Sequence, residues 1–143
     1  MQNNLLSSKK ALIPFFLFLI ILDQTAKFLI AKFQLNIFKN YGAVFGLGKN
    51  YGDFLIFFIA LFVILFFFKK NKFAQNQKNL IGFLLLFAGG ISNLIDRIFR
   101  GYVFDYIFIK TAVFNLADLF ILLGGIILLT QIITESTFFK KHK

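Results

Sequence analysis

Long apolar stretches dominate the chain and recur at residues 11–30, 52–68, 80–96 and 112–133. An α-helix rises 1.5 Å per residue, so about 20 mainly apolar residues cross the ~30 Å hydrocarbon core of a bilayer. The second and third stretches are slightly short for this. Their helices would span with little tilt, or with flanking polar side chains extended toward water. We therefore expect an α-helical membrane protein in which residues 1–143 form one domain with four transmembrane helices.

Two of the connections between these stretches have a different pattern. Residues 102–109, with the sequence YVFDYIFI, alternate imperfectly and are rich in aromatic and β-branched residues, which predicts a short strand. Residues 33–53 contain glycine at positions 42, 46, 48 and 52 amid aromatic residues, which predicts turns and short strands. Together they predict a small β element that lies on the membrane surface.

Basic residues flank the apolar stretches unevenly. The two chain ends and the connection between the second and third stretches carry nine Lys, whereas the other two connections carry six Lys or Arg. Cytoplasmic segments of membrane proteins are enriched in Lys and Arg. We therefore expect both termini in the cytoplasm, and the two longer connections, with their β element, on the extracytoplasmic side.

The composition narrows the possible functions. The chain is 59% hydrophobic and contains 24 Phe, which is too apolar for an ordinary soluble domain. Its net charge of +10 lies in clusters beside the apolar stretches and not in a separate basic domain, which disfavours nucleic-acid binding. The absence of cysteine excludes thiol catalysis, disulfides and thiolate metal sites.

The single histidine, His142, lies in a Lys-rich tail, which disfavours a Ser–His–Asp triad and a histidine metal site. We therefore expect no metal and no cofactor. If the protein is a hydrolase, carboxylates are the catalytic groups that remain.

Four of the six acidic residues lie in or beside apolar sequence, although an Asp at the centre of a transmembrane helix costs about 2.5–3.5 kcal/mol. Two of them, Asp105 and Asp118, have no basic residue three or four positions away that could neutralise them. Two carboxylates brought together can share a proton and activate a water molecule. This pair is therefore the candidate catalytic site.

Other polar residues are predicted to lie at the same depth. Asp23 and Lys27, one helical turn apart, would form either a packing ion pair or a substrate-positioning pair. Asp96 would be an interfacial acid that caps the end of the third helix, and Arg97 would pair with Asp105 or extend toward lipid headgroups. Asn93 would lie beside them at the outer end of that helix.

A fourth helix that begins near residue 112 would place Asp118 six residues below its start, with Asn115 on the same face. Asn115 could also serve only to satisfy backbone groups between helices. The pairs Gly89–Gly90 and Gly124–Gly125 predict close contact between helices.

Four sequence blocks resemble the signature blocks of lipoprotein signal peptidase, also called signal peptidase II. They occur in order along nearly the whole chain, as DQTAK (23–27), NYGAVFGLG (40–48), GGISNLIDRIFRGYVFDYI (89–107) and FNLADLF (114–120). Ser92 stands where this family usually has Gly before the Asn.

The resemblance implies a bacterial aspartic peptidase of the cytoplasmic membrane, with its active site at the extracytoplasmic face. Such enzymes remove the signal peptide from prolipoproteins whose cysteine already carries a diacylglyceryl group. The resemblance also implies that the partners are these substrates and membrane lipids, and that the protein is a monomer without a cofactor. By motif, the catalytic pair is Asp105 and Asp118, and the residues that support the site and substrate are Asp23, Lys27, Asn40, Asn93, Arg97 and Asn115.

Two other classes of function need separate consideration. A small proton-coupled transporter also uses membrane carboxylates, but it would need polar residues along a path across the bilayer. The inner halves of the predicted helices are almost wholly apolar, which argues against transport. A non-catalytic membrane scaffold would explain the glycine pairs but not two aspartates at one depth.

Overall fold

The computed structural model describes residues 2–33, 35–41 and 76–141, and the predicted helix at 52–68 lies outside them. The described chain contains three helices and four short strands. In order, these elements are α1 (Gln2–Lys32), β1 (Phe38–Asn40), α4 (Gln77–Arg100), β2 (Val103–Asp105), β3 (Ile107–Ile109), β4 (Ala112–Phe114) and α5 (Leu116–Lys141).

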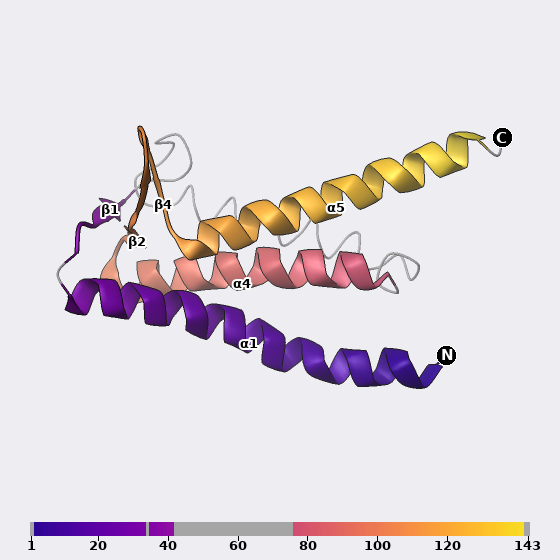
Figure 1. The fold of residues 1–143 in the computed structure, drawn as a ribbon, viewed down its shortest axis with the longest axis horizontal. Coiled ribbons are helices and arrows are strands. Elements are labelled where there is room, and N and C mark those ends of the chain that lie inside the picture. Colours follow the sequence, from indigo (N-terminus) through magenta and orange to yellow (C-terminus); the bar gives the residue numbers. More distant parts are fainter. Residues whose placement is uncertain (1, 34, 42–75, 142–143) are drawn as a thin grey trace.

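The three described helices lie side by side, with α4 between α1 and α5 (Figure 1). The N-terminal end of α1 and the C-terminal end of α5 lie at one end of the molecule, and the strands lie at the other. Each helix is long and apolar enough to cross a bilayer, over Ala11–Lys32, Gln77–Arg100 and Leu116–Thr134. The described part of the chain thus contains three candidate membrane spans.

The distribution of polar and apolar side chains is the reverse of that in a water-soluble protein. On α1, Ile13 and Ile21 are 68% and 62% exposed, whereas Asp23 and Lys27 are fully buried. Exposed aliphatic side chains are favourable when the surroundings are lipid, and buried charges avoid it. This arrangement agrees with the prediction of a multi-pass membrane protein.

One glycine of each predicted pair, Gly89 and Gly124, allows α4 and α5 to pack closely, whereas a Cβ atom on Gly125 would meet nothing within 4 Å. A Cβ atom on Gly89 would lie 2.3 Å from the carbonyl oxygen of Ala117, and one on Gly124 would lie 2.6 Å from that of Gly82. Both distances are too short for any side chain. The contact therefore brings the first turn of α5 against the middle of α4.

The strands form two separate antiparallel pairs, β1 with β2 and β3 with β4. The prediction of one strand over 102–109 was wrong, because the chain leaves the first pair at Tyr106. The N–H of Tyr106 donates to the carbonyl of Phe114 at 3.1 Å, which begins the second pair.

The predicted boundaries of the third and fourth helices were also wrong. The apolar residues 112–114 form strand β4, so the last helix begins at Leu116 and not near residue 112. Helix α4 extends beyond the predicted 80–96 at both ends. The side chain of Asn76 caps its start, and Gly101, with φ of 77°, ends it in a left-handed conformation.

Candidate active site

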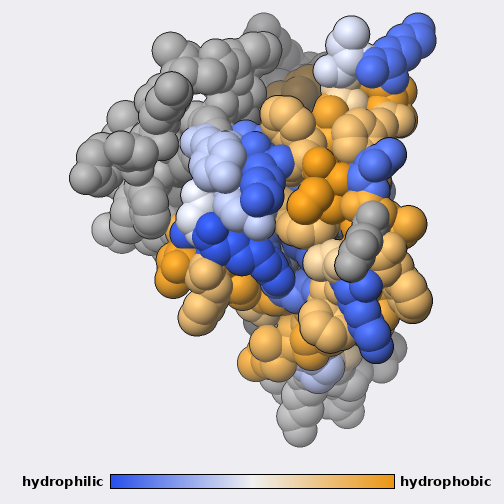
Figure 2. Space-filling model, turned by 90° about the vertical axis from the view of Figure 1, so that its left-hand side faces the viewer, coloured by the Kyte–Doolittle hydropathy of each residue, from blue (hydrophilic) through white to orange (hydrophobic). Residues whose placement is uncertain are grey.

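The two candidate catalytic aspartates lie where strands meet helices at the end of the molecule that carries the strands. Asp105 is the last residue of β2 and is fully buried, and Asp118 is half-buried in the first turn of α5. The expected depth of six residues for Asp118 was therefore wrong, because α5 begins later. Figure 2 looks onto this end, where hydrophilic residues gather with apolar residues beside them.

Asn115 and Asp118 form a reciprocal cap at the start of α5. The side-chain oxygen of Asn115 accepts from the N–H of Asp118, and Asp118 Oδ2 accepts from the N–H of Asn115, both at 3.0 Å. This is the geometry of a capping box, with Asn and Asp in place of Ser and Glu. The cap fixes one oxygen of Asp118 to the backbone.

Asp105 is held by two amide side chains from different elements. Asn115 Nδ2 donates to Asp105 Oδ1 at 2.6 Å, and Asn40 Nδ2 donates to Asp105 Oδ2 at 2.9 Å. The pairing of β1 with β2 sets Asn40 opposite Val103, so Asn40 reaches Asp105 along the diagonal of the ladder. Asn115 thus contacts both aspartates, which lie close together as a result.

Asn93 on α4 completes the link between the aspartates. Its Nδ2 donates to Asp118 Oδ1 at 2.8 Å, while its Oδ1 accepts from Asn115 Nδ2 at 3.1 Å. The same oxygen accepts from Lys27 Nζ at 3.1 Å. One amide therefore connects α1, α4 and α5 at the level of the carboxylates.

A buried ion cluster lies next to these amides. Lys27 Nζ lies 2.7 Å from both Asp23 Oδ2 and Asp96 Oδ2, and all three residues are fully buried. Arg100, on the last turn of α4, also pairs with Asp96. The expected Asp23–Lys27 pair is confirmed. The expectation that Asp96 caps the end of the helix was wrong, because α4 continues past it to Arg100 and Gly101 forms the cap.

Three further residues of this cluster were not predicted from the sequence, namely Gln24, Ser92 and Arg100. Gln24 Nε2 donates to Asp96 Oδ1 at 3.1 Å and to the hydroxyl of Ser92 at 3.0 Å, and that hydroxyl donates to Asp23 Oδ2 at 2.7 Å. The four-residue spacing of Asp96 and Arg100 was a usable signal for their ion pair.

Arg97 lies half-buried in the last turn of α4, where its carbonyl accepts from the N–H of Gly101 at 3.1 Å. This position is the outer end of the helix, as expected from the sequence. Its pairing with Asp105 stays a prediction.

Burial raises the pKa of Asp105 to about 6. The hydrogen bond from Asn40 opposes this rise, and the neighbouring charge of Asp118 adds to it. Burial also raises the pKa of Tyr106 to about 12, so that its phenol stays neutral, and its oxygen accepts from the N–H of Leu116 at 3.3 Å. Asp105 can therefore carry a proton at mildly acidic pH.

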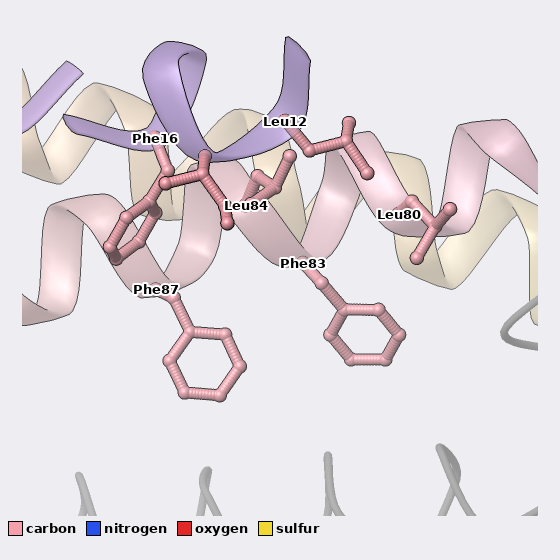
Figure 3. Close-up of a pocket in the computed structure, with 7 residues that line it drawn as sticks. Leu12, Phe16, Leu80, Phe83, Leu84 and Phe87 are labelled. Carbon is pink, nitrogen blue, oxygen red and sulfur yellow. The ribbon is translucent and has the colours of Figure 1, made fainter. Parts of the chain in front are cut away.

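The described residues contain no group of three or more His, Cys, Asp or Glu side chains that could hold a metal ion. An apolar cavity of about 270 Å³ lies elsewhere, between α1 and the N-terminal half of α4 (Figure 3). The described residues of its lining offer no polar side chain for catalysis and are Leu12, Ile13, Phe16, Leu80, Phe83, Leu84 and Phe87.

Comparison with known proteins identifies the family. The model of the family described as signal peptidase (SPase) II matches residues 15–134. The lipoprotein signal peptidase of Fusobacterium nucleatum is 33% identical over 147 residues, which cover 90% of this chain and 87% of that protein. That of Caldicellulosiruptor bescii is 39% identical over 128 residues, which cover 83% and 81%.

Solved structures agree with this relationship. One structure of a bacterial membrane enzyme matches with a TM-score of 0.75 and 28% identity, and covers 89% of this chain and 90% of its own. A second matches with a TM-score of 0.72 and 29% identity. The chain is therefore a multi-pass membrane protein that belongs to the signal peptidase II family.

Proposed function

We propose that this protein is an aspartic endopeptidase that removes the signal peptide from diacylglyceryl-modified prolipoproteins and cleaves before the lipidated cysteine. Its family and the names of its relatives support the substrate class. The observation that supports the aspartic mechanism is the contact of one residue, Asn115, with both Asp105 and Asp118. Two carboxylates held by one residue would share one proton, because each charge disfavours the other.

In the proposed reaction Asp105 holds the shared proton, since it is fully buried and its pKa is raised to about 6. The carboxylate of Asp118 takes a proton from a water molecule, whose oxygen attacks the carbonyl carbon of the scissile peptide bond. Asp105 gives its proton to the carbonyl oxygen. When the C–N bond breaks, Asp118 returns a proton to the leaving nitrogen, and Asp105 recovers its own from the hydroxyl.

The remaining residues of the predicted site would support this pair. We assign Asn40, Asn93 and Asn115 to holding the carboxylate oxygens, because each donates to one of them. Asp23 and Lys27 would fix α1 against this site, and Arg97 would act at the outer edge. No step requires a metal or an organic cofactor.

The proposed setting is the bacterial cytoplasmic membrane, with residues 1–143 forming one domain of four transmembrane helices and both termini in the cytoplasm. The position of the strands opposite the helix ends that lead to the termini supports an extracytoplasmic site (Figure 1). The acyl chains of the substrate would stay in lipid while a monomer of the enzyme cleaves the peptide. Reporter fusions after residue 75 and at the C-terminus should then report cytoplasm, and one near residue 103 should report the outside.

The catalytic pair is tested with Asp105→Asn and Asp118→Asn, assayed on a diacylglyceryl precursor. Each should lose cleavage while the protein stays folded, because proton exchange needs both carboxyl groups. Asp96→Asn is the matched control for Asp105→Asn, since Asp96 is as buried as Asp105 but contacts Lys27 and not the pair. It should reduce stability more than turnover per folded enzyme. Near-normal turnover by either pair variant would exclude the aspartic mechanism.

A further inference from the structure

We propose that Lys27 is a positioning residue for the carboxylate pair and acts through a single side-chain amide, that of Asn93. The catalytic role of Lys27 in this inference rests on the proposed function. The contacts from which the inference is argued do not depend on that function. In this role Lys27 does not touch the substrate. It determines which oxygen and nitrogen atoms the amides present to Asp105 and Asp118.

The ammonium of Lys27 has no hydrogen left for a substrate. It is fully buried and has three hydrogens to donate. Three acceptors surround it, Asp23 Oδ2 and Asp96 Oδ2 at 2.7 Å and Asn93 Oδ1 at 3.1 Å. An effect of Lys27 on the reaction must therefore pass through one of these three neighbours.

The chemistry of lysine fixes the orientation of the Asn93 amide. An ammonium group donates and cannot accept, so the Asn93 atom that faces Lys27 must be the oxygen. The nitrogen then faces the other way, and it donates to Asp118 Oδ1 at 2.8 Å. Rotation of this amide by half a turn would set N–H groups against Lys27 and oxygen against the carboxylate of Asp118.

The same oxygen also orients the second aspartate. Asn93 Oδ1 accepts from Asn115 Nδ2, which donates in turn to Asp105 Oδ1 at 2.6 Å. In this series of hydrogen bonds, which group donates and which accepts follows from the first donor, Lys27. One buried cation thus determines the donors offered to both carboxylates.

The two acids around Lys27 hold the backbone beside each catalytic residue. Asp23 Oδ1 accepts from the N–H of Ala117, the residue before Asp118, at 3.0 Å. Asp96 Oδ2 accepts from the N–H of Phe104, the residue before Asp105, at 3.2 Å. Asp23 and Asp96 thus hold the main chain beside the two catalytic aspartates, and the amide of Asn93 holds their side chains. Lys27 contacts all three of these residues.

A comparison of Asp23→Asn with the double variant Asp23→Asn/Lys27→Met tests this role. Both variants lack the Asp23–Lys27 ion pair. The double variant also lacks the Lys27–Asp96 ion pair and the donor to Asn93. The double variant should lose at least about tenfold more kcat than Asp23→Asn, with KM within about twofold. Lys27→Arg keeps a charged donor, so its kcat should be higher than that of Lys27→Met but lower than that of the wild type. Lys32→Met, an exposed position on the same helix, should retain normal kcat.

If Lys27 has only a structural role, a different result is expected. Both variants would then have a lower melting temperature, but the folded double variant would have the same kcat as Asp23→Asn. This outcome would overturn the proposal. Asn93→Ala provides a further check, because it leaves both ion pairs of Lys27 in place. It should lower kcat similarly, and adding Lys27→Met should cause no further loss. Additive losses would contradict the relay.

If the Lys27 variants do not fold, the proposal can still be tested by NMR without substrate and without changing Lys27. The buried ammonium of Lys27 should give an exchange-protected signal in ¹⁵N-lysine NMR spectra, unlike exposed lysines. Asp118→Asn should shift this signal, and it should leave the signal unchanged in an Asn93→Ala background. A Lys27 signal that is insensitive to Asp118→Asn would overturn the relay. Failure of the wild type to cleave precursor would instead overturn only the proposed function.

Discussion

Asp105→Asn is expected to abolish activity and yet make the protein more stable at neutral and alkaline pH. The pKa of Asp105 is raised from 3.8 to about 6, chiefly by burial. Above pH 6 the carboxyl group is ionised in both the folded and unfolded states, and the folded state bears the full cost of the buried charge. Below pH 3.8 it is protonated in both, and the cost disappears. Stability is therefore lost as the pH rises between these values.

The size of this effect follows from the shift. A difference of about two pKa units corresponds to about 3 kcal/mol at 1.36 kcal/mol per unit. Asn has one acceptor oxygen, so the variant leaves one of the donors, Asn40 or Asn115, without its bond, at a cost of about 1 kcal/mol. The net gain is about 2 kcal/mol at pH 8, which corresponds to a rise of about 4–8 °C in melting temperature.

Circular dichroism of the purified protein in detergent measures this directly, because the chain has no Trp for fluorescence. The variant should melt above the wild type at pH 8, and this advantage should vanish or reverse near pH 4. A melting temperature at or below that of the wild type at pH 8, or a difference that does not depend on pH, would show that the buried carboxylate of Asp105 does not destabilise the folded protein.

Three further predictions follow from the geometry. Asn40→Ala removes a hydrogen bond that lowers the pKa of Asp105, so the alkaline limb of kcat/KM should move to higher pH; a shift to lower pH would contradict the assignment of the proton to Asp105. Gly89→Ala should destabilise the protein by about 1–3 kcal/mol, because its Cβ would collide with Ala117, whereas Gly125→Ala meets nothing within 4 Å and should be tolerated; equal melting temperatures would contradict the packing. EDTA should leave cleavage unchanged, and activity lost in EDTA and restored by zinc would show that the carboxylates bind a metal.

The sequence predicted the structure correctly where the spacing of residues along a helix, or the lack of a side chain, allows few arrangements. Asp23 and Lys27, one turn apart on one helix, could reach each other in any packing of that helix, and the structure pairs them. The glycines at 89 and 124 likewise marked the close α4–α5 contact, because only the absence of a side chain permits it.

The errors arose where hydropathy cannot distinguish strand from helix. Residues 112–114 are apolar in either state, and only their pairing with β3 makes them a strand. The start of α5 then moved to Leu116, and the Asn115–Asp118 spacing became a cap and not a shared helix face. The bridge made by Asn93 was not predictable, because it depends on how three helices are rotated about their axes.

The most direct test of the proposed function is cleavage by the purified protein of one precursor peptide prepared with and without a diacylglyceryl group on its cysteine. Mass spectrometry of the products should show a single cut immediately before the lipidated cysteine. The unlipidated peptide should be cleaved far more slowly, because membrane attachment pre-positions the substrate at the pair. Cleavage at another bond, or equal rates for the two peptides, would contradict the proposed function.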